Sequence, residues 1–115
     1  MSAEKVEFLI VGSGAGGSTL AKELSKKGRK VMVIEKGKYE KKVGSFQDSL
    51  RYYDGNQITK MPRKSKEGII IWRAIMAGGS TVVSCGNATR CLEKEFLDFG
   101  INLEKEFIEA EKEMN

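Results

Sequence analysis

Apolar residues follow two different periodicities in the first third of the chain. Residues 6–11 (VEFLIV) form an apolar, β-branched run that stops at a glycine, which is typical of a strand buried on both faces of a parallel sheet. Residues 20–24 then place apolar side chains at helical spacing, with charged ones opposite, until Gly28 supplies a C-terminal stop. Residues 30–34 (KVMVI) are a second buried-type strand that ends at Glu35. The pattern predicts a right-handed βαβ unit, and therefore an α/β fold.

The middle of the chain lacks such periodicity. Residues 36–68 contain turn signals at 54–56 and 61–62 and no apolar stripe of helix length, apart from a short one at 46–53. We expect a long, irregular and basic excursion here. Its cations, such as Lys36, could lie near a phosphate, although a solvated loop is the simpler interpretation for any one of them.

The last third returns to regular patterns. Residues 69–72 (IIIW) are typical of a strand, and further on the chain becomes acidic and helical. A first helix is predicted over 92–99, ending at Gly100. A second is predicted over 103–114, with Asn102 as its candidate N-cap.

A glycine-rich sequence, Gly12-Ser13-Gly14-Ala15-Gly16-Gly17, joins the first predicted strand to the first helix. In this spacing Gly12 permits a sharp turn, Gly14 leaves room for a pyrophosphate beside the backbone, and Gly17 lets the helix pack on the strand. The unpaired N–H groups at the helix N-terminus attract a diphosphate. A glycine turn without a ligand is the alternative, but the flanking strands and helix favour a dinucleotide.

Glu35 follows these glycines by about 20 residues, the spacing of the acid that binds a ribose diol in dinucleotide-binding folds. We expect its carboxylate to accept hydrogen bonds from both ribose hydroxyls. A carboxylate at this position repels a 2′-phosphate, which argues against NADP as the main ligand.

A second glycine turn, Gly78-Gly79-Ser80-Thr81, follows the third predicted strand. Ser80 or Thr81 is a candidate cap for the next element, so backbone N–H groups and a hydroxyl could face an anion or a polar ring edge. Taken alone, an ordinary capped turn explains this sequence equally well.

Composition limits the chemistry that the chain can perform alone. Its 115 residues allow one domain at most, and 20 Lys+Arg stand against 16 Asp+Glu with no His. Without an imidazole there is no His-based general acid or base, no Ser–His pair and no His-bound metal, so we expect neither catalytic nor metal-ligating residues. The basic middle and acidic end are interpreted as solvated faces, with no nucleic acid as a partner, because interleaved aromatic residues are missing.

The cysteines and the N-terminal sequence suggest nothing more specialised. Cys85 and Cys91 lack CxxC spacing and neighbouring histidines, so neither a zinc site nor a redox pair is indicated. The start of the chain carries acidic residues and a short apolar run at 8–11, which fits neither a signal peptide nor a membrane span. We expect a soluble, cytoplasmic protein.

The two glycine sequences together resemble the N-terminal portion of the glucose/methanol/choline (GMC) oxidoreductases, which bind FAD in a Rossmann-type domain. The first, from Val6 through Gly37, is similar to the general FAD fingerprint. The second is more diagnostic: Arg73 followed by Gly78-Gly79-Ser80-Thr81 is similar to the family's arginine-led GG[ST][ST] segment, which lies along the FAD diphosphate. The chain differs from the family in Ala74, where glycine is common, and in Ser84, where asparagine is common.

The resemblance implies that residues 1–115 are part of an FAD-binding domain, with the excursion at 36–68 inside it and the substrate domain absent. Later strands of such a sheet return from downstream, so an incomplete parallel sheet with uncovered strands is expected. The complete enzyme would oxidise an alcohol with FAD, whereas this segment, without a C-terminal half or partner chain, would be inactive alone. The expected cofactor-binding residues are Gly12, Ser13, Gly14, Ala15, Gly17, Glu35, Lys36, Gly78, Gly79, Ser80 and Thr81.

Two other functions fit the first motif. One is a segment of another FAD-dependent dehydrogenase, which would share the first glycine motif but not necessarily the second. The other is a non-catalytic module that binds NAD or another adenine nucleotide.

Overall fold

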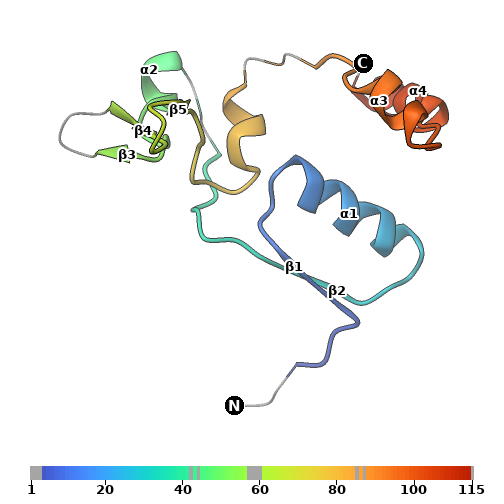
Figure 1. Cartoon of the computed structure of the whole chain (residues 1–115). Helices are drawn as coiled ribbons and strands as arrows, with labels where there is room; N and C mark the ends of the chain where they lie inside the picture. Colours follow the sequence, from blue (N-terminus) through green and yellow to red (C-terminus); the bar gives the residue numbers. More distant parts are fainter. Residues whose placement is uncertain are drawn as a thin grey trace.

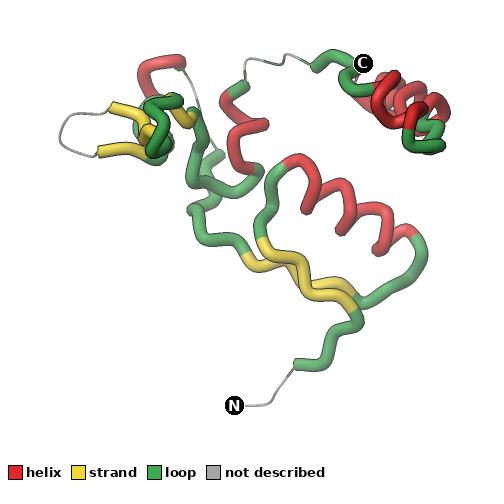
Figure 2. The backbone as a smooth tube through the Cα atoms, viewed as in Figure 1, coloured by secondary structure: helices red, strands yellow, loops and turns green. Residues whose placement is uncertain are grey.

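A parallel strand pair with one crossover helix forms the N-terminal unit of the computed structural model (Figures 1 and 2). The structure describes residues 4–41, 43, 45–56, 61–84, 86 and 88–114. The unit consists of β1 (Phe8–Val11), α1 (Ala15–Lys26) and β2 (Val31–Ile34). The strands pair in parallel along their whole length, from Phe8 opposite Val31 to Val11 opposite Ile34. The predicted α/β unit is therefore confirmed, with each strand beginning one or two residues later than its pattern indicated.

A small antiparallel unit follows, where the sequence predicted an irregular excursion. It contains α2 (Phe46–Ser49) and a three-stranded sheet in the order β3 (Gly55–Asn56), β4 (Met61–Lys64), β5 (Ile70–Ile71). The predicted turn signals at 54–56 and 61–62 fall largely on β3 and β4, so those turn assignments were wrong. β3 and β4 are too short to show an alternating pattern and were not predicted, whereas β5 lies within the strand predicted at 69–72.

Asp54 is the polar centre of this antiparallel unit. Its carboxylate is 8% exposed and accepts hydrogen bonds from Arg73 Nε at 2.6 Å and Arg63 Nε at 3.0 Å. Its backbone N–H donates to the Arg73 carbonyl at 2.8 Å. The hydrogen bonds from Arg73, with the nearby charge of Arg63, hold the pKa of Asp54 below its usual value. Asp54 thus joins β4 to the chain that leads into the second glycine sequence.

The C-terminal third contains η1 (Gly79–Val83), a 3₁₀ helix, and two α-helices, α3 (Glu93–Asp98) and α4 (Glu104–Met114). Gly100, with a φ of +76°, follows the end of α3 as predicted. The side chain of Asn102 accepts a hydrogen bond from the Glu104 backbone N–H at 3.0 Å, so it caps the first turn of α4 from one residue further out than predicted. Cys91 is exposed and free, whereas Cys85 lies outside the described residues.

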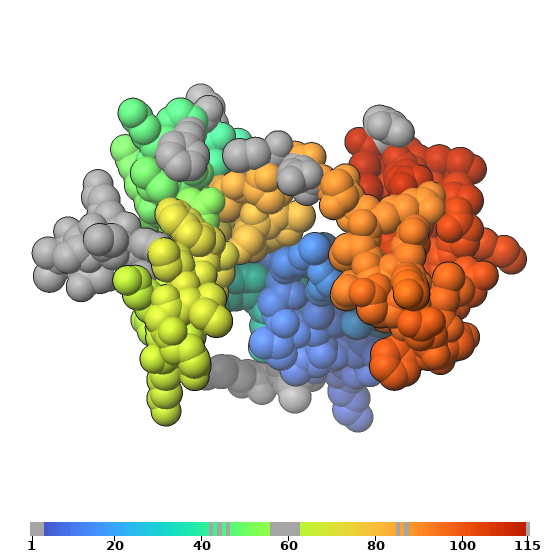
Figure 3. Space-filling view, turned by 45° about the horizontal axis from the view of Figure 1, so that its top comes forward, coloured from blue at the N-terminus to red at the C-terminus, as the bar shows by residue number. Residues whose placement is uncertain are grey.

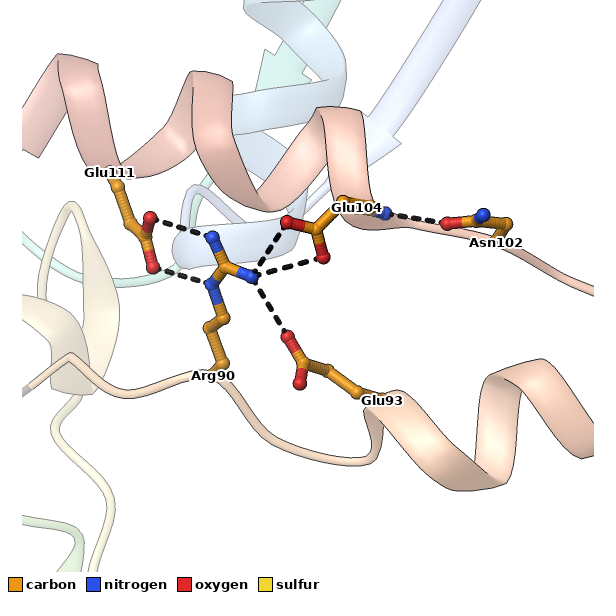
Figure 4. Close-up of polar contacts among 5 residues, drawn as sticks. All are labelled: Arg90, Glu93, Asn102, Glu104 and Glu111. Carbon is orange, nitrogen blue, oxygen red and sulfur yellow. Dashed lines mark hydrogen bonds and ion pairs between the residues drawn. The ribbon is translucent and has the colours of Figure 1, made fainter.

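One arginine joins the last two helices (Figure 4). The guanidinium of Arg90 donates to both carboxylate oxygens of Glu111, at 2.6 and 2.8 Å, and also to Glu93 and Glu104. It lies 5.5 Å from the ring centre of Phe107. The carboxylates, Glu111 first, raise the already high pKa of Arg90. This cluster fixes the α3–α4 pair around a single cation.

The N-terminal unit lies between the antiparallel unit and the α3–α4 pair (Figure 3). Ion pairs from Lys22 and Lys26 on α1 to Glu113 on α4 connect it to the C-terminal helices. All three side chains are close to half exposed, so these pairs stabilise the arrangement only weakly.

The described residues bury very little apolar surface. Among them, Ile10 and Met76 are the buried apolar side chains. The radius of gyration is 17.1 Å, against about 13 Å for a compact domain of this length. Apolar side chains of the parallel strands remain exposed, among them Phe8, Leu9, Val11, Val33 and Ile34. The prediction of strands buried on both faces is therefore wrong for this chain, because α1 alone does not cover a two-stranded sheet.

The exposure of these strands nevertheless agrees with the incomplete parallel sheet that we expected from the resemblance. No helix within the described ranges is both long and apolar enough to span a bilayer.

Candidate functional site

The corner between β1 and α1 is shaped by two of its glycines. Gly12 has a φ of +93°, a conformation that other residues rarely adopt, and its N–H donates to the Ile34 carbonyl of β2 at 2.7 Å. A Cβ on Gly17 would lie 2.0 Å from the Gly12 carbonyl oxygen. The roles predicted for these two residues, the sharp turn and the close helix–strand contact, are confirmed by this geometry.

Gly14 has a different environment from Gly12 and Gly17. Its φ of −65° is open to any residue, and a Cβ built on it would meet no described atom within 4 Å. It is the N-cap of α1, where no side-chain cap hydrogen bond is made and the first turn contains no acidic residue. With neither a capping side chain nor an acid in this turn, its N–H groups keep the partial positive charge of a helix N-terminus.

Glu35, directly after β2, bends back onto this corner. Its Oε2 accepts hydrogen bonds from the Ser13 backbone N–H and from the Ser13 hydroxyl, both at 2.8 Å. Its Oε1 accepts one from the Gly37 N–H at 2.7 Å. The Ser13 N–H, then the Gly37 N–H and the Ser13 hydroxyl, lower the pKa of Glu35 from 4.5 to about 2. The acid is therefore ionised at neutral pH and is fixed at the first glycine turn.

The remaining hydrogen-bonding capacity of Glu35 is limited. A carboxylate offers about four acceptor positions, and the three donors from Ser13 and Gly37 already occupy most of them. This count leaves about one acceptor position for a ribose hydroxyl. For Glu35 to accept hydrogen bonds from both ribose hydroxyls, as predicted, one of its hydrogen bonds from Ser13 or Gly37 would have to break.

The second glycine sequence lies against the first, although it is more than 60 residues away in the chain. The Gly78 N–H donates to the Ser13 hydroxyl oxygen at 2.9 Å, and a Cβ on Gly79 would lie 3.3 Å from the Gly14 Cα. A parallel bridge between Lys38 and Met76 also joins the chain after Glu35 to the chain just before the second glycine sequence. The two glycine sequences and Glu35 therefore form one continuous surface.

Gly37 makes the parallel bridge possible. A Cβ on Gly37 would lie 2.3 Å from both the Cα and the N of Met76, so only glycine allows this approach. Met76 is 2% exposed, and the Ala77 N–H donates to the Lys38 carbonyl at 3.0 Å. Neither Gly37 nor Met76 was among the predicted site residues. A glycine two residues after the acid was the available signal for the first, whereas the sequence holds none for the second.

Ser80 and Thr81 do not cap η1, so that prediction was wrong. Gly78 is the N-cap residue of η1 and makes no side-chain cap hydrogen bond. The Ser80 hydroxyl accepts a hydrogen bond from the Ala74 N–H at 3.0 Å, and the Thr81 hydroxyl donates to the Gly78 carbonyl at 2.9 Å. Their hydroxyls are used to fold the second glycine sequence itself.

The other predicted positions are more peripheral. Ala15 is the exposed first residue of α1, and Lys36 is exposed next to Glu35. Arg73, which leads the second sequence in the resemblance, donates to Asp54 and so belongs to the antiparallel unit. It holds the approach to the second glycine sequence in place.

The low pKa of Glu35 predicts a pH effect on stability. A group whose pKa falls from 4.5 to about 2 on folding stabilises the native state above pH 4.5, and this contribution is lost as the pH falls towards 2. We expect Glu35→Gln to lose stability less steeply than the wild type over that interval. Urea midpoints measured across it, with the exposed Glu106→Gln on α4 as control, check the difference. Parallel curves for the wild type and Glu35→Gln would contradict the hydrogen bonds described here.

Comparison with known proteins agrees with the geometry of this corner. Residues 10–39 match the family model described as an NAD(P)-binding Rossmann-like domain. No curated protein and no solved structure matches the chain. The matched stretch runs from β1 through Glu35 and Gly37 and ends before the second glycine sequence. It identifies a Rossmann-like segment for a dinucleotide cofactor and does not distinguish FAD from NAD(P).

Proposed function

We propose that this chain is the FAD-binding N-terminal part of an oxidoreductase that, when complete, oxidises the CH–OH group of an alcohol. The observation that carries the proposal is the contact between the two glycine sequences. A general dinucleotide site needs only the first of them. The second, which resembles the GMC segment along the FAD diphosphate, reaches the same corner through Gly78 and Gly79.

The residues at the corner fit an FAD molecule. The open space above Gly14 and the start of α1 suits a diphosphate, because a Cβ there would meet nothing and no side chain caps the helix. Glu35, ionised and held by Ser13, is the acceptor for the adenosine ribose. Gly78 and Gly79 would limit the diphosphate on its other side. The flavin, when bound, would accept the hydride, and this chain would hold and orient it.

A second candidate is a module that binds NAD and has no catalytic role of its own, and the match to an NAD(P)-binding Rossmann-like domain is equally compatible with it. Both functions use the first glycine sequence and Glu35 in the same way. They differ in the second glycine sequence, which the NAD function does not require.

Titration of the full chain with FAD, NAD and ADP distinguishes the two. We expect FAD to bind more tightly than ADP, because contacts beyond the adenosine half add affinity. Isothermal calorimetry, or quenching of flavin fluorescence for FAD alone, measures this. A preference for NAD would contradict the flavin assignment and support the second candidate.

Glu35→Ala is expected to weaken FAD binding about 10- to 100-fold, through loss of charge-assisted hydrogen bonds to the ribose. The matched control is Glu106→Ala, which removes an exposed acid on α4 and should bind as the wild type does. Unchanged affinity in a folded Glu35→Ala protein would remove Glu35 from the site.

A further inference from the structure

The hydroxyl of Ser13 connects the acid to the second glycine sequence. It donates its single proton to Glu35 Oε2 at 2.8 Å and accepts the Gly78 N–H at 2.9 Å. Alanine at position 13 could do neither, whereas serine does both from one short side chain. The hydrogen bond from Gly78 is partly buried, so its loss would leave a donor with little access to water.

We propose that Ser13 is a positioning residue: its hydroxyl orients the Glu35 carboxylate towards the ribose and ties that acid to the second glycine sequence. The proposal rests on the proposed function for the identity of the ligand. It goes beyond that function because Ser13 would act by orienting Glu35, and this role is separate from any contact between Ser13 and the diphosphate.

The geometry explains why Ser13 in particular can do this. Its backbone N–H and its hydroxyl both reach the same carboxylate oxygen, so Oε2 is fixed while Oε1, bound by the Gly37 N–H, keeps an acceptor position towards solvent. The Ser13 carbonyl accepts the Ser18 hydroxyl at 2.6 Å, which anchors Ser13 to α1. Rotation of Glu35 away from the ribose position therefore requires the loss of several hydrogen bonds at once.

The affinity test compares ADP with 2′,3′-dideoxy-ADP, which lacks the ribose hydroxyls. In the wild type we expect ADP to bind more tightly. Ser13→Ala should reduce that preference about three- to tenfold, the size of one hydrogen bond, and should have no further effect on it in a Glu35→Ala background. A purely structural role would weaken both ligands equally and leave the preference unchanged. Ser13→Thr, which keeps the hydroxyl, should restore it, and Ser25→Ala, at an exposed serine of α1, is the matched control.

A ligand-free measurement tests the connection to the second glycine sequence. Hydrogen exchange of the Gly78 amide, followed by NMR, should be about tenfold faster in Ser13→Ala than in the wild type or Ser25→Ala. Equal exchange rates would overturn the connection whatever the ligand. If the wild type binds no adenine nucleotide, the proposed function fails, and with it the ribose role of Ser13. If it binds but its preference for ADP survives Ser13→Ala, only the positioning role fails.

Discussion

Gly17→Ala is expected to destabilise the protein by about 2–3 kcal/mol or to prevent folding of the N-terminal unit. The added Cβ would lie 2.0 Å from the backbone oxygen of Gly12 and 3.3 Å from a side-chain carbon of Ile10, one of the two buried apolar residues described. The Gly12 backbone cannot move away from the added Cβ as a flexible side chain could. Relief would have to come from a shift of α1 away from β1.

Gly16→Ala is the matched control for this change. Gly16 precedes Gly17 in the same helix, but a Cβ on it would meet nothing within 4 Å. Alanine should therefore stabilise the helix, by about 0.5–1 kcal/mol. Urea unfolding followed by far-UV circular dichroism compares the two variants. If both shift the midpoint in the same direction by similar amounts, the close helix–strand contact is not as described.

Gly14→Val is expected to weaken FAD binding more than about 100-fold while leaving the unfolding midpoint close to that of the wild type. The branched side chain would occupy the open space next to the first turn of α1, where the diphosphate is proposed to lie. Because the φ of Gly14 is −65°, the turn itself tolerates a side chain. This variant should therefore separate binding from folding, which Gly17→Ala cannot do.

The measurement for Gly14→Val is FAD titration of a protein whose circular dichroism matches the wild type. Gly14→Ala should show a smaller loss in the same direction, and Gly16→Ala should bind FAD normally. Wild-type affinity in Gly14→Val would place the diphosphate away from the N-terminus of α1.

The N-terminal unit could be predicted closely because its signals are local. A β-branched run, a glycine turn, a helical stripe and a second run follow one another within 30 residues, and each element depends mainly on its own sequence. The same holds for Gly100 and Asn102 around the last helices. Positive φ and side-chain caps are properties that single residue types favour.

The remaining features depend on contacts between distant segments, which a single sequence does not show. The antiparallel unit depends on Asp54 meeting two arginines, and its strands β3 and β4 are too short for a periodic pattern. The hydroxyls of Ser80 and Thr81 bond to the Ala74 N–H and the Gly78 carbonyl, which are near in the chain, but these bonds depend on how the turn folds. Ser13 was predicted as part of a phosphate-binding turn. Its hydrogen bonds to Glu35 and Gly78 could not be predicted, because they join segments that are far apart in the sequence.

The bridge between Lys38 and Met76 has a consequence for variation in chain length. Residues 39–75 begin and end next to this bridge. The geometry of the corner therefore does not depend on how many residues lie between Lys38 and Met76. Doubling such a loop costs only about 0.6 kcal/mol in closure entropy. Insertions, deletions or an exchanged subdomain should therefore be accommodated between Lys38 and Met76. Gly37 cannot be replaced in the same way, because a Cβ on it would collide with the Met76 backbone.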